Sequence, residues 1–136
     1  MPKTIIQKII FKNTDPENLY AFYMSAKKHS EITGALAKIS AKEGAKFTAY
    51  DDYITGKNLQ LIEDKLIVQS WRGSDWASDD VDSTFILLFE AKGKDTVMYV
   101  THANLPDEHA KSIADGWHEY YWNPWKAFLS KDQSAK

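Results

Sequence analysis

The segment from Asp115 to Trp125 most constrains the fold of this chain, because it carries five aromatic residues within nine positions of a predicted helix. At about 100° per residue, Trp122 points away from the other large side chains and Tyr120 lies at the edge. A helix this aromatic is costly to leave in water, so the rest of the chain should form the surface that receives it. The apolar face of the predicted helix contains Ala110, Ile113, Trp117, Tyr121, Pro124 and Phe128.

Pro124 lies inside this predicted helix, which we expect to begin at Pro106 and to end at about Ser130. An internal proline removes a backbone hydrogen bond and clashes with the preceding turn, at a cost of about 3 kcal/mol. The helix should therefore kink or be interrupted between Tyr120 and Asn123. The kink either wraps the helix around a sheet or leaves a gap between helix and sheet in which a ligand can bind.

The chain before this helix is predicted to form a strand, two short helices and a series of further strands. Residues 4–12 are rich in β-branched side chains. Thr14 and Glu17 have the spacing of a capping box that starts the first helix. The second helix should run from about Ser25 to Ile32 and stop at Gly34. The later strands are expected at residues 36–40, 44–50, 53–62, 66–71, 83–90 and 96–104.

This order of elements predicts an α+β fold. Consecutive hairpins indicate a curved antiparallel sheet of about six or seven strands, and the lack of strand–helix alternation argues against a parallel sheet. The chain has 136 residues, of which 43% are hydrophobic and 26% charged, as is usual for one globular domain. We expect that domain to cover residues 1–130 and residues 131–136 to form a frayed tail.

The composition excludes several classes of function. The formal net charge of −2 gives no electrostatic basis for binding nucleic acid or an anionic membrane. Without any Cys, the chain cannot form disulfides or thiolate metal sites. No apolar run approaches the ~20 residues that cross a bilayer, and we expect no signal peptide. These observations predict a cytoplasmic protein with neither nucleic acid nor membrane as a partner.

The candidate chemistry lies around one histidine. His102 shares a strand face with Met98 and Val100, and this face should look toward the final helix. His102 is either a hydrogen-bonded core residue or a group that binds a ligand or transfers a proton. The four histidines lack a zinc-binding spacing, and the aspartates between Asp75 and Asp82 do not match a calcium loop, so we expect no metal and no cofactor.

Two tryptophans fall outside the predicted core. Trp76 lies in a polar loop, where such a residue either folds back over a cavity or anchors a partner protein. Trp122 raises the same alternatives on the far side of the final helix, and it could also pack against the first helices. We therefore predict Trp76 and Trp122 as a candidate partner surface.

Several short motifs follow one another in a fixed order along the chain. They are Gly44–Phe47, Gly56 with Leu59 and Leu61, Lys65–Arg72 with Trp76, Thr96–His102, Leu105-Pro106, Gly116-Trp117, Tyr120-Tyr121 and Lys126. This ordered series resembles one known family: the C-terminal-type domain of the heat-shock protein 90 ATPase activators, including their stand-alone bacterial relatives. Ala45 departs from the glycine usual in the family.

The resemblance implies a START-like (SRPBCC) helix-grip fold, in which a curved sheet grips a long C-terminal helix and a cavity between them takes apolar ligands in many members. In the eukaryotic activators, a separate N-terminal domain provides the main stimulation of the chaperone ATPase. We expect no such domain before the first strand, which weakens the case for chaperone activation.

We therefore predict a non-enzymatic domain that binds a small apolar or aromatic molecule between sheet and helix. No nucleophile elbow, phosphate loop or dinucleotide motif is present in the sequence. The first alternative is a regulator of the heat-shock protein 90 ATPase with that chaperone as partner, and a further alternative is an enzyme with His102 as acid or base. The predicted cavity lining is Tyr50, Trp71, Met98, Val100, His102, Trp117, Tyr121 and Phe128.

Overall fold

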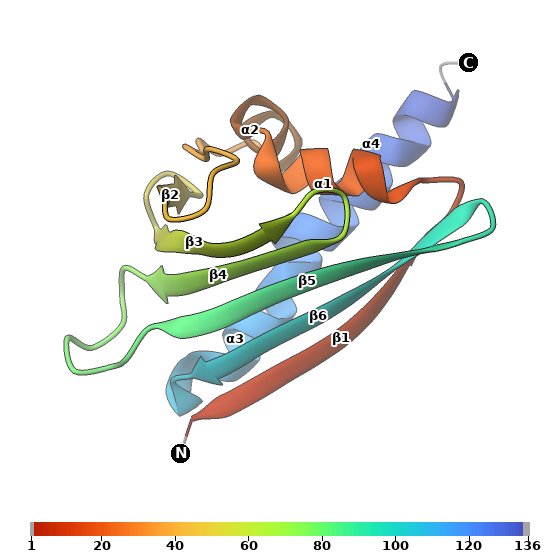
Figure 1. Cartoon of the computed structure of the whole chain (residues 1–136). Helices are drawn as coiled ribbons and strands as arrows, with labels where there is room; N and C mark the ends of the chain where they lie inside the picture. The colour runs from red at the N-terminus through yellow and green to blue at the C-terminus, as the bar shows by residue number, and fades with distance from the viewer. Residues whose placement is uncertain (1, 135–136) are drawn as a thin grey trace.

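A computed structural model describes residues 2–134 and shows a curved antiparallel sheet that holds a long helix across one face (Figure 1). The six strands follow the order β1-β6-β5-β4-β3-β2 across the sheet. They are β1 (Lys3–Phe11), β2 (Lys46–Ala49), β3 (Ile54–Ile62), β4 (Leu66–Gly73), β5 (Ser83–Lys92) and β6 (Asp95–Leu105). The predicted α+β helix-grip fold is confirmed.

The two short helices after β1 pack on the same face of the sheet as the long helix. Helix α1 (Pro16–Met24) brings Tyr23 against Phe85 of β5, with the ring centroids 5.6 Å apart. Helix α2 (Ala26–Thr33) begins at the N-cap Ser25 and ends at Gly34, whose φ of 78° is the left-handed conformation that suits glycine. The predicted limits of the second helix are thus close to those observed.

The start of α1 differs from the prediction. Its N-cap is Asp15, whose carboxylate accepts a hydrogen bond from the amide of Asn18 at 3.0 Å. Thr14 is buried instead, and its hydroxyl donates to the carbonyl of Lys12 at 2.8 Å. The predicted capping box from Thr14 to Glu17 is therefore wrong, because a carboxylate one residue later takes its place.

The segment 36–40 does not form the predicted strand. It makes only an isolated bridge between Lys38 and Thr48. The buried side chain of Asn58 donates through Nδ2 to the carbonyls of Ser40 and Lys42, at 2.7 and 3.0 Å. These side-chain hydrogen bonds hold the segment beside β3 as a loop, so the sheet has six strands.

The long helix is interrupted where the sequence predicted. It consists of α3 (Asp107–Trp117), a π-helical turn η1 (His118–Trp122) and α4 (Asn123–Ser134). Pro124 cannot donate to the carbonyl of Tyr120, and the amide of Asn123 bonds to the carbonyl of His118 five residues earlier. Helix α4 continues to Ser134 rather than Ser130, so most of the predicted frayed tail is helical, and residues 135–136 lie outside the described residues.

The π turn also changes which side chains face the sheet. It adds a residue to the turn, so Trp122 rotates inward and is completely buried. Its ring stacks on that of Trp117 with centroids 5.2 Å apart, and its indole Nε1–H donates to the Gln7 side chain at 2.8 Å. Gln7 in turn donates to the carbonyl of Ala114 at 3.0 Å. The prediction of Trp122 as a partner surface is therefore wrong.

Within residues 2–134, every helix is too short or too polar to cross a bilayer.

Candidate functional site

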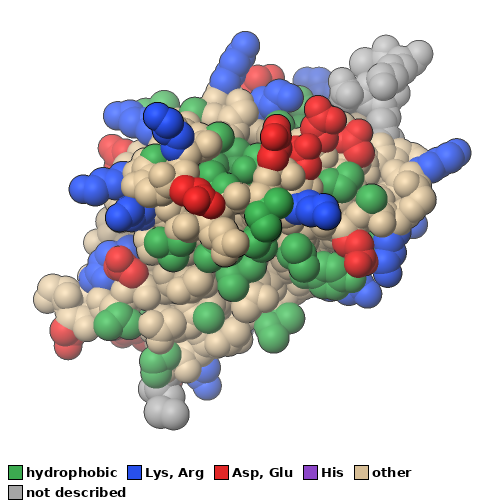
Figure 2. All heavy atoms as spheres, in the orientation of Figure 1, with side chains coloured by type: hydrophobic (Ala, Val, Ile, Leu, Met, Phe, Trp, Pro, Cys, Tyr) green, Lys and Arg blue, Asp and Glu red, His purple; other side chains and the backbone are tan. Residues whose placement is uncertain are grey.

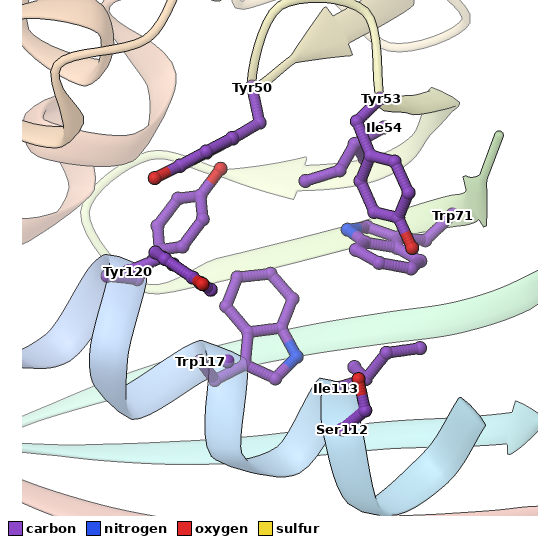
Figure 3. A pocket seen from close by; sticks show the side chains of 10 residues that line it. Tyr50, Tyr53, Ile54, Trp71, Ser112, Ile113, Trp117 and Tyr120 are labelled. Atoms are coloured by element: carbon purple, nitrogen blue, oxygen red, sulfur yellow. The ribbon is translucent and has the colours of Figure 1, made fainter. Parts of the chain in front are cut away.

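A pocket of about 280 Å³ lies between the long helix and the β2–β4 end of the sheet (Figure 3). The sheet side contributes Tyr50, Tyr53, Ile54 and Trp71. The helix contributes Ser112, Ile113, Gly116, Trp117, Tyr120 and Tyr121. The walls are therefore aromatic rings and aliphatic side chains, with a few hydroxyl groups, which is the usual composition of a small-molecule site.

Trp117 is the most firmly held wall of the pocket. Its ring stacks on Phe85 of β5, with centroids 4.3 Å apart and planes at 10°, and on Trp122 from its own helix. It contacts Tyr121 and Trp71 at centroid distances of 4.8 and 5.8 Å. The pocket is thus built on a rigid aromatic cluster rather than on loops.

The opposite wall comes from a strained turn between β2 and β3. Tyr50, Asp51 and Asp52 have φ angles of 53°, 56° and 69°, in the left-handed region that residues other than glycine seldom adopt. Asp51 holds the turn by accepting from the amide of Leu36 at 2.8 Å and donating its own amide to the Leu36 carbonyl at 3.0 Å. Such strain tends to gather at functional sites, and here it places the Tyr50 ring 5.4 Å from the ring of Tyr120.

The pocket carries no formal charge at neutral pH. Among the described residues that line it there is no Lys, Arg, His, Asp or Glu. Burial raises the pKa of Tyr50, with further upward contributions from Tyr120, Asp51 and Glu119. Burial also raises the pKa values of Tyr53 and Tyr121, so the hydroxyls of these three tyrosines stay protonated.

His102 lies beneath the pocket rather than in its lining. The Trp117 Nε1–H, which can only donate, bonds to His102 Nδ1 at 3.1 Å. The proton of the neutral ring is therefore on Nε2, which donates to the Ser83 hydroxyl at 2.8 Å, and Ser83 donates to the Trp71 carbonyl at 2.7 Å. Both ring nitrogens are occupied, and burial lowers the pKa of His102 to about 3. His102 is a core residue that positions Trp117 and is absent from the described lining of the pocket, so this arrangement gives no support to the alternative of His102 as acid or base.

A second buried histidine supports the other end of the pocket and was not singled out in the sequence. His29 Nδ1–H donates to the carbonyl of Tyr23 at 2.9 Å, so its Nε2 accepts from the Tyr121 hydroxyl at 2.8 Å. Burial lowers the pKa of His29 to about 4. The two partners lie 6 and 92 residues away along the chain, so no local spacing could have revealed this arrangement.

The structure brings together only part of the predicted cavity lining. Tyr50, Trp71, Trp117 and Tyr121 line the pocket. Met98 and Val100 are completely buried on the same face of β6 as His102 and are not among the described lining residues. The predicted lining position of Phe128 is wrong, because α4 carries it past the pocket onto Phe22, with the rings 5.5 Å apart.

Trp76 folds back onto the protein instead of standing free. Only 7% of its surface is exposed, its ring lies 5.7 Å from that of Trp71, and it stacks on His109 at 6.1 Å. The Arg72 guanidinium lies 5.8 Å from the same ring. Trp76 therefore backs the pocket wall at Trp71, and its prediction as a partner surface is wrong. Among residues 2–134, no group of three or more acidic residues and histidines could hold a metal ion.

A curved antiparallel sheet around a long C-terminal helix, with a pocket between them, defines a helix-grip domain of the α+β class. The family model described as "Activator of Hsp90 ATPase homolog 1-like protein" matches residues 13–130. The chain therefore belongs to this family, as the resemblance in the sequence indicated.

Individual relatives agree with this assignment. The chain is 28% identical over 109 residues to the human activator of 90 kDa heat shock protein ATPase homolog 1, and 28% identical over 103 residues to a homologue from Dictyostelium discoideum. These matches cover 80% and 75% of this chain. The chain spans only 32% and 27% of the length of these two curated relatives.

Solved structures show the same fold. An Hsp90 activator from Plasmodium falciparum superposes with a TM-score of 0.82 over 96% of both chains, at 24% identity. CalU16 from Micromonospora echinospora superposes with a TM-score of 0.79 at 16% identity, over 98% of this chain and 80% of its own. At these identities the similarity establishes the architecture alone.

Proposed function

We propose that this domain binds a small, largely apolar or aromatic molecule in the pocket between Trp117 and Tyr50, without catalysing a reaction. The observation that carries the proposal is the pocket of about 280 Å³ with aromatic walls on both the sheet and the helix side. Ligand sites commonly enclose about 300–1,000 Å³, so the ligand is at the small end, of one or two fused rings.

The chemistry of the lining supports binding over catalysis. The only ionisable groups that the described lining residues offer are tyrosine hydroxyls, and burial raises the pKa values of Tyr50, Tyr53 and Tyr121. Acid–base catalysis at neutral pH needs a group with a pKa near 7. The pocket therefore supplies shape and apolar surface, with the hydroxyls to orient what binds.

Gly116 provides the sharpest test of this proposal. It lines the pocket, and a Cβ placed there meets only the Tyr120 ring, at 3.6 Å, which is ordinary contact. We expect Gly116→Leu to fill the pocket and to weaken binding of 2-acetylnaphthalene at least about tenfold, a loss of about 1.4 kcal/mol. The measurement is an NMR titration followed through backbone amides and indole N–H groups.

The control is Gly116→Ala at the same position. Its single methyl group leaves most of the pocket open, so binding should stay within about threefold of the wild type, and the variant should be slightly more stable because alanine favours a helix over glycine. If 2-acetylnaphthalene binds equally well to wild type and Gly116→Leu, the pocket is not the binding site.

A second candidate function is regulation of the heat-shock protein 90 chaperone. It rests on the relatives, several of which are named as activators of that ATPase and match 75% or more of this chain. Both functions are compatible with the cytoplasmic location expected from the sequence.

The outer face of the sheet offers a surface for this second function. Figure 2 shows apolar side chains gathered over the strands and bordered by charged ones. Ile6 is 78% exposed, and Leu88 and Ile62 are 43% and 45% exposed. Exposed apolar side chains gathered on one face often mark a contact with another protein.

Titration of purified heat-shock protein 90 with this domain tests the second function. We expect the domain to bind the chaperone and to change its ATPase rate, and we expect Ile6→Lys on the outer face to reduce both effects. Ile5→Val, on the inner face of the same strand, is the control and should retain both. An ATPase rate unchanged by a large excess of the domain would contradict the second function.

A further inference from the structure

We propose that the pocket selects an uncharged planar ligand carrying an oxygen acceptor, which accepts a hydrogen bond from the indole N–H of Trp71. This inference rests on the proposed binding function and adds the chemical class of the ligand. It depends on two observations: an unpartnered donor in the pocket wall and the distribution of charge around the pocket.

The unpartnered donor is Trp71 Nε1. Trp71 is 97% buried, with 3% of its surface exposed, and its Nε1–H has no hydrogen-bond partner among the described residues. Figure 3 shows the nitrogen edge of the ring turned toward the open space between Tyr53 and Trp117. Buried N–H groups nearly always have a partner, because leaving one unpaired in a protein interior is costly. The nitrogen is closed off while the pocket is empty, so a ligand oxygen supplies that partner once the neighbouring rings shift slightly to admit it.

The same surroundings explain why Trp71 can hold this position without a partner of its own. Its carbonyl accepts from the Ser83 hydroxyl at 2.7 Å, and its ring packs edge-on against His102 with centroids 4.7 Å apart. Trp76 covers the ring on the outer side at 5.7 Å. The indole is thus fixed by packing against two rings and by the hydrogen bond to its main chain, with its N–H edge on the pocket side.

The charge around the pocket selects against anions. The described lining residues include no cation, and Asp75 accepts a hydrogen bond from the Tyr53 hydroxyl at 2.7 Å. Asp51 and Glu119 lie close enough to Tyr50 to raise its pKa. A carboxylate ligand would therefore lose its water beside three carboxylates with no positive charge to replace it. A neutral carbonyl or hydroxyl oxygen can accept from Trp71 without that penalty.

Three compounds of nearly equal shape separate these effects. They are 2-acetylnaphthalene, which has a neutral acceptor, 2-ethylnaphthalene, which has none, and 2-naphthoate, which is an anion. We expect the ketone to bind roughly five- to tenfold more tightly than the ethyl compound, the gain from one net hydrogen bond. The naphthoate should bind more weakly than both, and binding is measured by NMR titration of the whole chain.

The indole N–H resonances report the hydrogen bond directly. The ketone should move the Trp71 N–H proton downfield, and the ethyl compound should not. Trp125 is the internal control, because its indole Nε1 is also buried and unpartnered but it packs against Phe11 and Phe22, away from the pocket. The Trp125 resonance should stay unchanged with every compound.

Trp71→Phe assigns the resonance and tests the selectivity. In this variant the ketone and the ethyl compound should bind with equal affinity, within about twofold. If the variant does not fold, the shift of the Trp71 N–H resonance in the wild-type protein is the test of the proposed hydrogen bond. Equal affinities on the wild type, or an unmoved Trp71 N–H in the ketone complex, would overturn the inference while leaving the binding function intact. Failure of all three compounds to bind would overturn both.

Discussion

Lowering the pH from 7 to 4.5 is expected to reduce the free energy of unfolding by several kcal/mol, because two buried histidines must stay neutral. The pKa values of His29 and His102 fall from the usual 6.5 to about 4 and about 3 in the folded protein. Between these values and 6.5, the unfolded chain binds more protons than the folded one, so stability is full above pH 6.5 and is lost as the pH falls. Each histidine contributes about 1.4 kcal/mol per pH unit in this window.

Urea denaturation at pH 7, 5.5 and 4.5 measures this loss. His102→Asn is the matched variant, because its amide oxygen can accept from Trp117 but it does not bind a proton. This variant should be less stable than the wild type at pH 7 and should show a shallower loss on acidification. The exposed carboxyl of Asp95, whose pKa lies below its usual 3.8, titrates below the window and does not account for the slope. Equal slopes for wild type and variant would contradict a neutral buried His102.

Gly56→Ala is expected to destabilise the domain by about 3 kcal/mol or more, the upper end of the range for overpacked sites. A Cβ at Gly56 would lie 1.9 Å from the backbone oxygen of Ser70 and 2.6 Å from the ring of Phe47. The Ser70 oxygen cannot move without separating β3 from β4, since Gly56 pairs with Trp71 and Lys57 pairs with Ser70. The buried Phe47 ring is held by the pairing of Phe47 with Gly56 between β2 and β3. Thermal or urea unfolding of the two proteins measures the difference.

Gly116→Ala supplies the comparison for this second prediction. Both substitutions add one methyl group to a glycine that is not in a left-handed conformation, but the Cβ at position 116 meets nothing nearer than 3.6 Å. The two variants should therefore move stability in opposite directions. If the Gly56→Ala protein is as stable as the wild type, the spacing between β3 and β4 at Gly56 must be wider than in this structure.

The order of the elements followed from the sequence because each boundary has a local cause. Ser25 and Gly34 cap α2, and the final helix is interrupted near the position predicted from the missing N–H of Pro124. Two predictions of local structure were wrong because a neighbouring side chain made the competing hydrogen bonds. Asp15 displaced Thr14 as a cap, and the side chain of Asn58 held residues 36–40 as a loop, and neither outcome can be read from propensities.

The helical wheel could place Trp117 and Tyr121 but not Trp122. A wheel at a constant angle assumes a regular α-helix, and the π turn from His118 to Trp122 breaks this assumption after Trp117. Trp122 is consequently buried against Trp117 and bonded to Gln7 of β1, a contact between residues 115 positions apart.

The sequence predicted which types of residue form the candidate site better than it predicted how they are arranged in space. An excess of aromatic residues on one helix pointed to Trp117 and Tyr121, but the opposite wall depends on the left-handed turn at Tyr50, which has no glycine to mark it. His102 was placed on the correct strand face toward the helix. Its exclusion from the pocket follows from the Trp117 indole, which occupies the space between the imidazole and the pocket.

The central claim, that the pocket between helix and sheet binds a ligand, is tested most directly by mapping where 2-acetylnaphthalene binds in a ¹H–¹⁵N NMR titration. We predict that the largest shifts occur at the Gly116 amide and the indole groups of Trp71 and Trp117, with intermolecular contacts from the naphthalene protons to the Tyr50 ring. Shifts confined to the outer face of the sheet, around Ile6 and Leu88, would contradict it.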